Sequence, residues 1–550
     1  MYLSHHFLRG FLFLKKYNFF YFSSFFIYFV LFVVPFVVFD GFSDPFTTIK
    51  WMLTLFSINA CIFTFLFKEK SLVLPKFPPV FLYLLVFTLF FIVFNSYYHN
   101  VPLYTYENVR RFLFWGAAIF FLNLFYSETE ERFKKFEYII IFALTIFISF
   151  SLLEFILYPD LPPYFTFGNI NLASEYVAFS MAFLWGRLTR IWQKLQTSFF
   201  FNFASALSVS YIYLTSSRST YIAIVLMSFF FIVQNIKYIK EIMKIIVMAL
   251  IIIALIILIK YLYPSPPPDL VLLKDFSARW ALYVNTLRMA VDTPLGVGVG
   301  QYEFASLPYL GEIFPRFNET RIFHSPHNEF LRYLSEDGVI VSLLFFLLGS
   351  SLVYTFWKKI RETFQEHTVF LYFSIVLFIQ ALFQFPLLEP YPYYLTSFLI
   401  GYFFSVAKVD VKIYVLSGLS RTILFILNFL ALTVFVLYFS SQYVTFHLSK
   451  NEMLNKFACH AGRSWFACLN VSSYYLYQRD LDQAERYTRK ILEWQPLNFQ
   501  GMKSLGFILL YQGERRKACN LFKEFNSFFQ DQSSLKNVIS YECVFSPRPF

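Results

Sequence analysis

Hydrophobic and polar positions divide the chain into two parts with different patterns. Between residues 19 and 440, apolar runs alternate with short polar loops, and most runs approach the length that crosses a bilayer as a helix, roughly 17 to 25 residues. We predict about thirteen spans, at 19–39, 47–67, 79–94, 112–126, 137–158, 172–185, 199–214, 220–234, 245–263, 339–356, 369–385, 393–407 and 423–440. The predicted fold is an all-α, polytopic transmembrane helical bundle of about twelve or thirteen spans.

Basic residues gather in every second loop between these spans. The clusters are Lys15/Lys16, Lys68/Lys70/Lys76, Arg132/Lys134/Lys135, Arg187/Arg190/Lys194, Lys237/Lys240/Lys244, Lys358/Lys359/Arg361 and Lys408/Lys412. Because loops rich in Lys and Arg stay in the cytoplasm, this alternation predicts a multi-pass protein with a cytoplasmic N-terminus. The opposite loops are nearly free of basic residues, apart from Arg110/Arg111, Arg218 and the arginines of the long loop 264–338. We expect those outward-facing arginines to have a function.

Composition agrees with a membrane location and excludes one class of partner. Hydrophobic residues make up 58% of the chain and charged residues only 15%, whereas soluble domains are about a quarter charged. The net charge of +12 is divided among short clusters between spans. That distribution is an orientation signal, and we expect no nucleic acid partner.

Beyond Ser440 charged residues recur at helical spacing, so the predicted domains are 1–440 and 441–550. Two segments align at a period of about 34 residues: Tyr477, Asp480, Ala484 and Tyr487 recur as Tyr511, Glu514, Ala518 and Leu521. This pattern resembles the tetratricopeptide repeat, whose helix pairs stack through small residues. Helices near 451–459 and 531–540, or the membrane domain, are expected to complete the stack. The domain is either a docking surface for a protein partner or a structural cap.

An odd number of spans places this C-terminal domain outside the cytoplasmic membrane. It contains Cys459, Cys468, Cys519 and Cys543. In an oxidising periplasm these can form two disulfides, with three possible connectivities. The alternative is that they are small buried core residues.

The long loop 264–338 contains the residues best suited to chemistry. His327 follows Ser325 and Pro326, which are typical of an N-cap and a first helical position. We therefore expect a helix that starts there, places His327 at its beginning and runs over Asn328–Glu336 towards Gly338. A neutral imidazole at such a place can accept a proton from a hydroxyl group. His324 suggests a metal pair, but no carboxylate or third histidine is placed to complete one, so we predict no metal site.

Arg218 and Arg279 are the candidate anion-binding residues. Arg218 lies between two spans with almost no loop, a costly position that calls for an anionic partner. Guanidinium groups bind phosphate oxygens in bidentate fashion, and two of them could hold a lipid diphosphate. The alternative for each is a salt bridge with Glu303, Glu329 or Glu336. Glycines Gly296, Gly298 and Gly300 are expected to form a tight turn rather than a dinucleotide-binding loop.

Together these residues resemble the O-antigen ligase-like (Wzy_C) superfamily of membrane glycosyltransferases. The resemblance, over roughly residues 163–394, rests on a His-Asn-x9-Gly pattern, a Ser-Arg-Ser step, an Arg-Trp pair, a Pro-Leu-Gly-Val-Gly turn and a Gly-x-x-Asn turn. These occur at His327–Gly338, Ser217–Ser219, Arg279–Trp280, Pro294–Gly298 and Gly168–Asn171. After Gly338 the chain departs from the Gly-x-x-Gly-Thr-Thr pattern of the ligases, which leaves the subclass open.

The resemblance implies a reaction at the periplasmic face of a bacterial inner membrane. The donor would be an undecaprenyl-diphosphate-linked glycan, the acceptor lipid A–core or a protein, and neither metal nor cofactor would be needed. His327 would be the catalytic base and Arg218 and Arg279 the diphosphate-binding residues, with supporting positions at Asn328, Gly338, Asn171 and His324. We expect inverting transfer in O-antigen ligation. The alternatives are a protein O-oligosaccharyltransferase, an O-antigen polymerase and, without chemistry, a polysaccharide transporter.

Overall fold

The structure is a computed structural model that describes residues 19–39, 46–69, 71–99, 106–126, 129–158, 165–193, 199–215, 217–262, 274–310, 325–407, 410–461, 464–528 and 543. The described chain is almost entirely helical. The bundle comprises α2 (Phe19–Tyr28) with its continuations Phe29–Val33 and Val34–Phe36, α3 (Thr47–Lys68), α4 (Pro79–Tyr98), α5 (Tyr106–Phe125), α6 (Thr129–Leu157), α7 (Ile170–Gln193), α8 (Phe199–Thr215), α9 (Arg218–Gln234), α10 (Ile239–Leu262), α15 (Gly338–Glu366), α16 (Thr368–Phe383), α17 (Pro390–Val406) and α18 (Gly418–His447).

Every predicted span lies on one of these helices. Within the described residues, four segments are long and apolar enough to cross a membrane, namely Thr47–Lys68, Phe133–Leu157, Ile236–Leu258 and Gly418–Thr445, and shorter apolar helices accompany them. Large apolar side chains such as Phe87, Val225 and Leu250 are exposed on the bundle, as expected where lipid replaces water. The protein is thus an all-α membrane protein, and the number of crossings stays a prediction.

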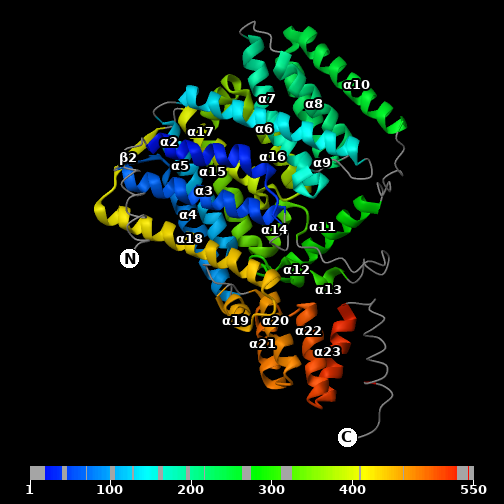
Figure 1. Ribbon diagram of the computed structural model, residues 1–550. Coiled ribbons are helices and arrows are strands. Elements are labelled where there is room, and N and C mark those ends of the chain that lie inside the picture. Colours follow the sequence, from blue (N-terminus) through cyan, green and yellow to red (C-terminus); the bar gives the residue numbers. More distant parts are fainter. Residues whose placement is uncertain are drawn as a thin grey trace, which may run out of the picture.

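The centre of the bundle is formed by α7 and α17, which are buried along most of their lengths. Aromatic rings fill the space around them, as in the stacked pair Phe133 and Tyr402 at 3.8 Å between centroids. Gly401 lets α17 approach α5 closely, since a Cβ there would lie 2.5 Å from the Ala118 carbonyl oxygen. Small residues commonly allow such backbone approach in membrane bundles. In Figure 1, α17 and α5 lie next to each other within the bundle.

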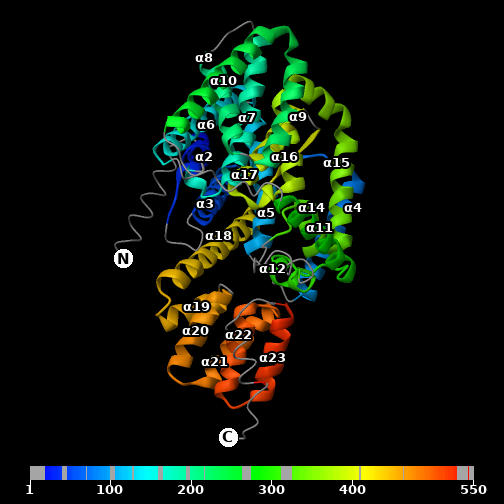
Figure 2. The same cartoon turned by 90° about the vertical axis from the view of Figure 1, so that its right-hand side faces the viewer.

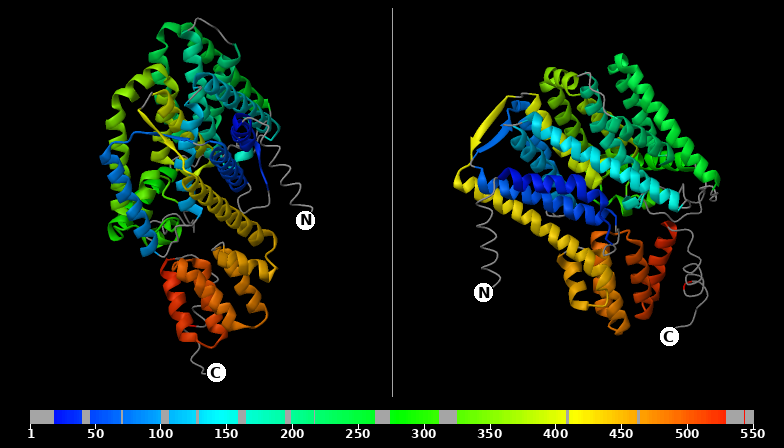
Figure 3. Two further views of the ribbon diagram at one scale, coloured as in Figure 1. Left: turned by 90° about the vertical axis from the view of Figure 1, so that its left-hand side faces the viewer. Right: turned by 45° about the horizontal axis from the view of Figure 1, so that its top comes forward.

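A two-stranded antiparallel ribbon is the one element type that the sequence pattern did not predict. It joins β1 (Ser71–Pro75) to β2 (Val411–Val415), with Ser71 paired to Val415. Both strands lie in loops that the charge pattern assigns to the cytoplasm. The other edge of β1 is covered by the amide of Asn123 from α5, which exchanges two hydrogen bonds with the Val73 backbone. Figure 3 shows the ribbon at the margin of the bundle, away from the C-terminal helices.

The long loop folds into α11 (Lys274–Asp292), α12 (Tyr302–Ala305), α13 (Leu307–Leu310) and α14 (Glu329–Glu336). These elements lie at the end of the bundle that faces the C-terminal helices (Figure 2). The C-terminal helices are α19 (Glu452–Ala461), α20 (Trp465–Tyr477), α21 (Leu481–Trp494), α22 (Phe499–Tyr511) and α23 (Arg515–Phe528). The predicted domain boundary at residue 440 lies inside α18, which continues to His447.

The C-terminal helices form two successive hairpins, α20–α21 and α22–α23, whose spacing matches the sequence repeat. The aligned alanines Ala484 and Ala518 are both completely buried, as stacked helix pairs require. The cysteines pair as Cys459–Cys468 and Cys519–Cys543. Two disulfides are therefore present, and one of the three possible connectivities is realised. Assignment to the tetratricopeptide repeat stays a prediction, and its expected helix at 531–540 lies outside the described residues.

The long loop and the C-terminal helices share one hydrophobic cluster. Leu282 and Met289 of α11 and Phe304 of α12 belong to it, together with Met502 and Leu505 of α22. The rings of Phe304 and Trp465 make an edge contact across the junction, at 6.4 Å between centroids. Burial of such surface stabilises the junction by roughly 25 cal/mol per Å². The C-terminal domain is thus joined to the loop that contains the candidate site.

Candidate functional site

The backbone of the site is set by two glycine positions that touch. Gly296 and Gly338 both have positive φ, +83° and +85°. A Cβ on Gly296 would lie 2.4 Å from the Glu336 carbonyl oxygen, and one on Gly338 would lie 2.4 Å from the Leu295 carbonyl carbon. No side chain larger than hydrogen fits at either position, and only glycine adopts this φ readily. The expected tight turn is therefore present.

The Pro-Leu-Gly-Val-Gly turn caps the end of α14. Val297 N donates to the Ser335 carbonyl at 2.9 Å, and Gly298 N donates to the Glu336 carbonyl at 3.0 Å. Val339 N donates in return to the Pro294 carbonyl at 2.9 Å. These bonds satisfy carbonyls that a helix end leaves without partners. Two of the sequence patterns, the glycine turn and the residues before Gly338, are thus one structural unit.

The start of α14 differs from the sequence-based expectation. The helix begins at Glu329, and Asn328 is its N-cap, with Oδ1 accepting from Leu331 N at 2.9 Å. Ser325 was expected as the N-cap, but its hydroxyl receives only a long bond from His327 N, at 3.5 Å. The reason is that Asn is as good a cap as Ser and Asn328 is anchored further by donating Nδ2 to the Leu382 carbonyl at 2.9 Å. His327 therefore precedes the helix instead of starting it.

His327 has a left-handed backbone, with φ of +52°, a conformation that is uncommon for residues other than glycine. Its carbonyl accepts a hydrogen bond from the Tyr283 hydroxyl of α11 at 3.1 Å. Its ring lies 5.4 Å from the ring of Phe385, which follows α16. His327 is thus held between the long loop and the bundle, and its side chain is partly exposed.

The last turn of α16 brings the separate sequence patterns together. Leu382 O accepts from Asn328, and Gln380 Nε2 donates to Thr220 Oγ1 at 3.1 Å. Thr220 in turn donates to Ser174 Oγ of α7 at 3.2 Å. Thr220 is in the first turn of α9, which begins at Arg218, and Ser174 follows Asn171 in the first turns of α7. The N-terminal ends of α7, α9 and α14 therefore meet around one helix end.

Arg218 and Arg279 have no carboxylate partner among the described residues. Of the three glutamates considered as alternatives, Glu329 and Glu336 make ion pairs with Arg332 within α14. Arg279 lies one turn before Tyr283 on α11, close enough to interact electrostatically with its hydroxyl. Partial burial raises the pKa of Tyr283, and the Arg279 charge opposes that rise. Tyr283 is consequently a proton donor at neutral pH.

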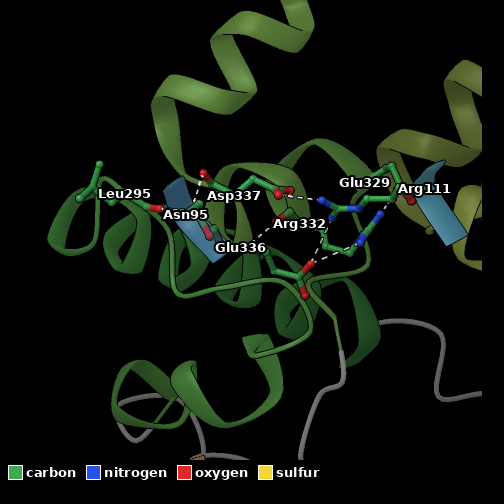
Figure 4. A network of polar contacts seen from close by, with 8 residues as sticks. Asn95, Arg111, Leu295, Glu329, Arg332, Glu336 and Asp337 are labelled. Carbon is green, nitrogen blue, oxygen red and sulfur yellow. Dashed lines mark hydrogen bonds and ion pairs between the residues drawn. The ribbon is translucent and has the colours of Figure 1, made fainter. Parts of the chain in front are cut away.

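A buried charge network that sequence reasoning did not identify holds α14 in place. Arg332 lies between Glu329 and Glu336, while Arg111 of α5 donates to Asp337 Oδ1 at 2.7 Å (Figure 4). Asn95 of α4 adds hydrogen bonds to the Leu295 and Asp337 carbonyls, at 2.5 and 3.1 Å. The Glu-x-x-Arg-x-x-x-Glu spacing is a signal that could have revealed the pairs within the helix. On α5, Arg111 stood out in the sequence as an outward-facing arginine, but its partner Asp337 could not be predicted, and Asn95 of α4 had no sequence signal.

The geometry is suited to an anion beside a base. Helix N-termini carry partial positive charge and unsatisfied N–H groups, which favour phosphate. Three such ends lie around the last turn of α16 near His327, and one of them, that of α9, begins at Arg218. His324 lies outside the described residues, and within the described part no group of three or more His, Cys, Asp and Glu residues could hold a metal ion.

Comparison with known proteins finds a family similarity in one part of this chain. Residues 203–346 match the O-antigen ligase family (Wzy_C). The matched segment contains Arg218, Arg279, His327, Asn328 and Gly338, but not Asn171 or the C-terminal helices. No curated protein and no solved structure matches the chain. The central segment of this helical membrane protein is thus similar to the O-antigen ligase family.

Proposed function

We propose that this protein is an inverting membrane glycosyltransferase that moves a glycan from an undecaprenyl-diphosphate-linked donor to an acceptor hydroxyl at the periplasmic face, most simply in O-antigen ligation to lipid A–core. The observation that carries the proposal is the meeting of His327, the Arg218 end of α9 and the capped start of α14 at the last turn of α16. The family match to residues 203–346 supports the same reaction class.

In the proposed step, the acceptor oxygen attacks the anomeric carbon from the side opposite the diphosphate. The new glycosidic bond forms as the bond to the diphosphate breaks, which inverts the anomeric centre. His327 takes the hydroxyl proton, and undecaprenyl diphosphate leaves with the bonding electron pair. Arg218 and Arg279 stabilise the charge that develops on the leaving group. Asn328, Gly338 and Asn171 support the backbone around these groups.

The periplasmic location is supported by two features. Cys459–Cys468 and Cys519–Cys543 are paired, and disulfides persist in oxidising compartments such as the periplasm. The C-terminal domain that contains them packs against the loop 264–338 through one hydrophobic cluster. We therefore expect the domain and the site to lie on the same side of the membrane.

A second candidate, protein O-oligosaccharyltransfer, is favoured by the repeat-like C-terminal hairpins, because such helix pairs commonly bind polypeptide. Deletion of the gene distinguishes O-antigen ligation from protein O-oligosaccharyltransfer. Loss of the ligase would leave free lipid A–core with accumulated lipid-linked polymer, whereas loss of an oligosaccharyltransferase would leave an unglycosylated secreted protein. A polymerase would instead leave lipid A–core bearing a single repeat unit.

Purified protein with a defined lipid-linked donor tests the chemistry directly. We expect release of undecaprenyl diphosphate that depends on the acceptor, with inversion at the transferred sugar. Intact donor after incubation with lipid A–core, with a protein acceptor and with a second donor molecule would contradict the proposal and favour a transporter.

A further inference from the structure

The Tyr283 hydroxyl lies where three elements of the candidate site meet. It is 3.1 Å from the His327 carbonyl oxygen and 3.2 Å from the Leu382 carbonyl oxygen. The side chain comes from α11, His327 precedes α14, and Leu382 is in the last turn of α16. A phenol has one proton to donate, and in this arrangement the two carbonyls share it.

The contact to the His327 carbonyl is the shorter of the two. The Leu382 carbonyl also accepts from Asn328 Nδ2 at 2.9 Å, so it keeps a donor without Tyr283. Tyr283 is half-buried, and burial raises its pKa, so the hydroxyl keeps this proton at neutral pH.

The backbone of His327 needs such a contact. Its φ of +52° lies in the left-handed region, which costs a residue with a side chain roughly 1–2 kcal/mol compared with a right-handed conformation. Strained backbone persists only where its surroundings hold it, and it concentrates at functional sites. Asn328 fixes the chain on one side of this peptide as the N-cap of α14. Tyr283 fixes the carbonyl itself.

We propose that Tyr283 is a positioning residue that holds the His327 backbone in its left-handed conformation and thereby aims the imidazole at the acceptor hydroxyl. This inference rests on the proposed role of His327 as the base. Helix α11 then has two roles: it contributes the charge of Arg279, and through Tyr283 it determines where the base lies. Since α11 also belongs to the cluster shared with α22, the C-terminal domain supports the same contact.

The test compares Tyr283→Phe with Tyr302→Phe. Tyr302 also forms a buried hydroxyl contact with α11, to Thr286 Oγ1 at 2.7 Å, but does not touch His327. Both variants lose one hydroxyl and keep the ring. In Tyr283→Phe we expect kcat to fall about tenfold, the effect of one hydrogen bond, with the KM for donor changed less than twofold. Tyr302→Phe should keep the wild-type kcat. Equal kcat in wild type and Tyr283→Phe would overturn the inference.

Hydrogen exchange measured on the same full-length proteins makes the result independent of the reaction. Peptides covering 325–331 should exchange faster in Tyr283→Phe than in wild type or Tyr302→Phe. If wild type shows no transfer, or His327→Ala retains it, the proposed function fails while the exchange data still decide whether Tyr283 holds the segment. Unchanged exchange in Tyr283→Phe refutes the contact, whatever the activity.

Discussion

At His327 the backbone and the side chain have separate partners. The carbonyl accepts a hydrogen bond from Tyr283, and the ring lies beside Phe385. The imidazole can therefore gain or lose a proton without breaking the hydrogen bond that orients the backbone. As the proposed base, His327 would contribute roughly 10²–10⁴-fold to glycan transfer.

His327→Ala is accordingly expected to lose transfer by roughly that factor while still binding the lipid-linked donor. His324→Ala is the control, because only His327 has the Asn328-to-Gly338 spacing, and it should be far milder. Turnover of the purified variants, with and without EDTA, measures this. Wild-type turnover in His327→Ala would exclude the base, and a zinc-reversible loss with EDTA would restore a metal mechanism.

The second prediction at residue scale concerns Arg218 and Arg279. Each Arg→Gln substitution should abolish transfer, and Arg→Lys should restore little, because lysine cannot bind a diphosphate in bidentate fashion. Arg288, nine residues after Arg279 on α11, is exposed and has no proposed contact with the diphosphate, so Arg288→Gln should retain activity. Diphosphate release by correctly inserted protein is the readout, and activity in both Arg→Gln variants would remove these residues from the mechanism.

The sequence indicated which segments form the candidate site but did not indicate how they are arranged. Gly338, Gly296 and the histidine could be recognised from residue types and spacing. The cap could not, because Ser325-Pro326 and Asn328 are both good helix starts and only the bond from Asn328 to Leu382 decides between them. Tyr283 had no signal at all, since an aromatic residue on an amphipathic helix has many ordinary roles.

At the scale of elements, α14 is a short helix fixed at both ends. Its start is tied to α16 through Asn328, its end is capped by the glycine turn, and its flank is bound through Asp337 to α5. Removing Arg111 would leave Asp337 buried without its cation, which is strongly destabilising. A helix fixed in this way keeps the direction of its N-terminal N–H groups constant.

Gly338→Ala tests the contact between the turn and α14. The added Cβ would clash with Leu295 in a backbone conformation that L-residues avoid, so we expect a loss of roughly 1–3 kcal/mol. Gly349→Ala in the same helix has nothing within 4 Å of the new Cβ and should be neutral or slightly stabilising. Thermal unfolding in detergent compares the two. A Gly338→Ala melting temperature equal to that of Gly349→Ala would contradict the close approach.

Helix positions followed from the apolar pattern because each predicted span is a long run of one residue class. The ribbon did not, because β1 and β2 are short strands, far apart in sequence, whose pairing depends on tertiary proximity. Asn123 illustrates the same limit: a lone amide in an apolar helix gives no indication that it pairs with a strand edge.

For the whole molecule, the charge alternation predicts on which side each part lies. Alkaline phosphatase fused after Leu448, where α18 has ended, should be active because it would be exported. Fusions after Lys194 or Lys359 should be inactive. Enzyme activity of whole cells, normalised to fusion protein amount, is the measurement, and an active fusion at either lysine would refute the orientation.

The junction between the long loop and the C-terminal domain gives a second prediction at this scale. Phe304→Ala would remove a buried ring that contacts Trp465, and buried Phe→Ala changes cost roughly 3–5 kcal/mol. We expect faster proteolysis between α18 and α19 and reduced transfer. Val291→Ala, at an exposed position of the same loop, is the control. Equal proteolysis rates in the two variants would show that the domain does not depend on this contact.

The pairing of β1 with β2 also has a consequence for the order of events during synthesis. β1 leaves the ribosome early, but its partner is not made until residues 411–415, after most of the helices. Until then one edge of β1 has no strand beside it, and Asn123 covers only the other. Closure of the ribbon is therefore a late step, which joins the beginning of the bundle to its end only after the intervening helices have been translated.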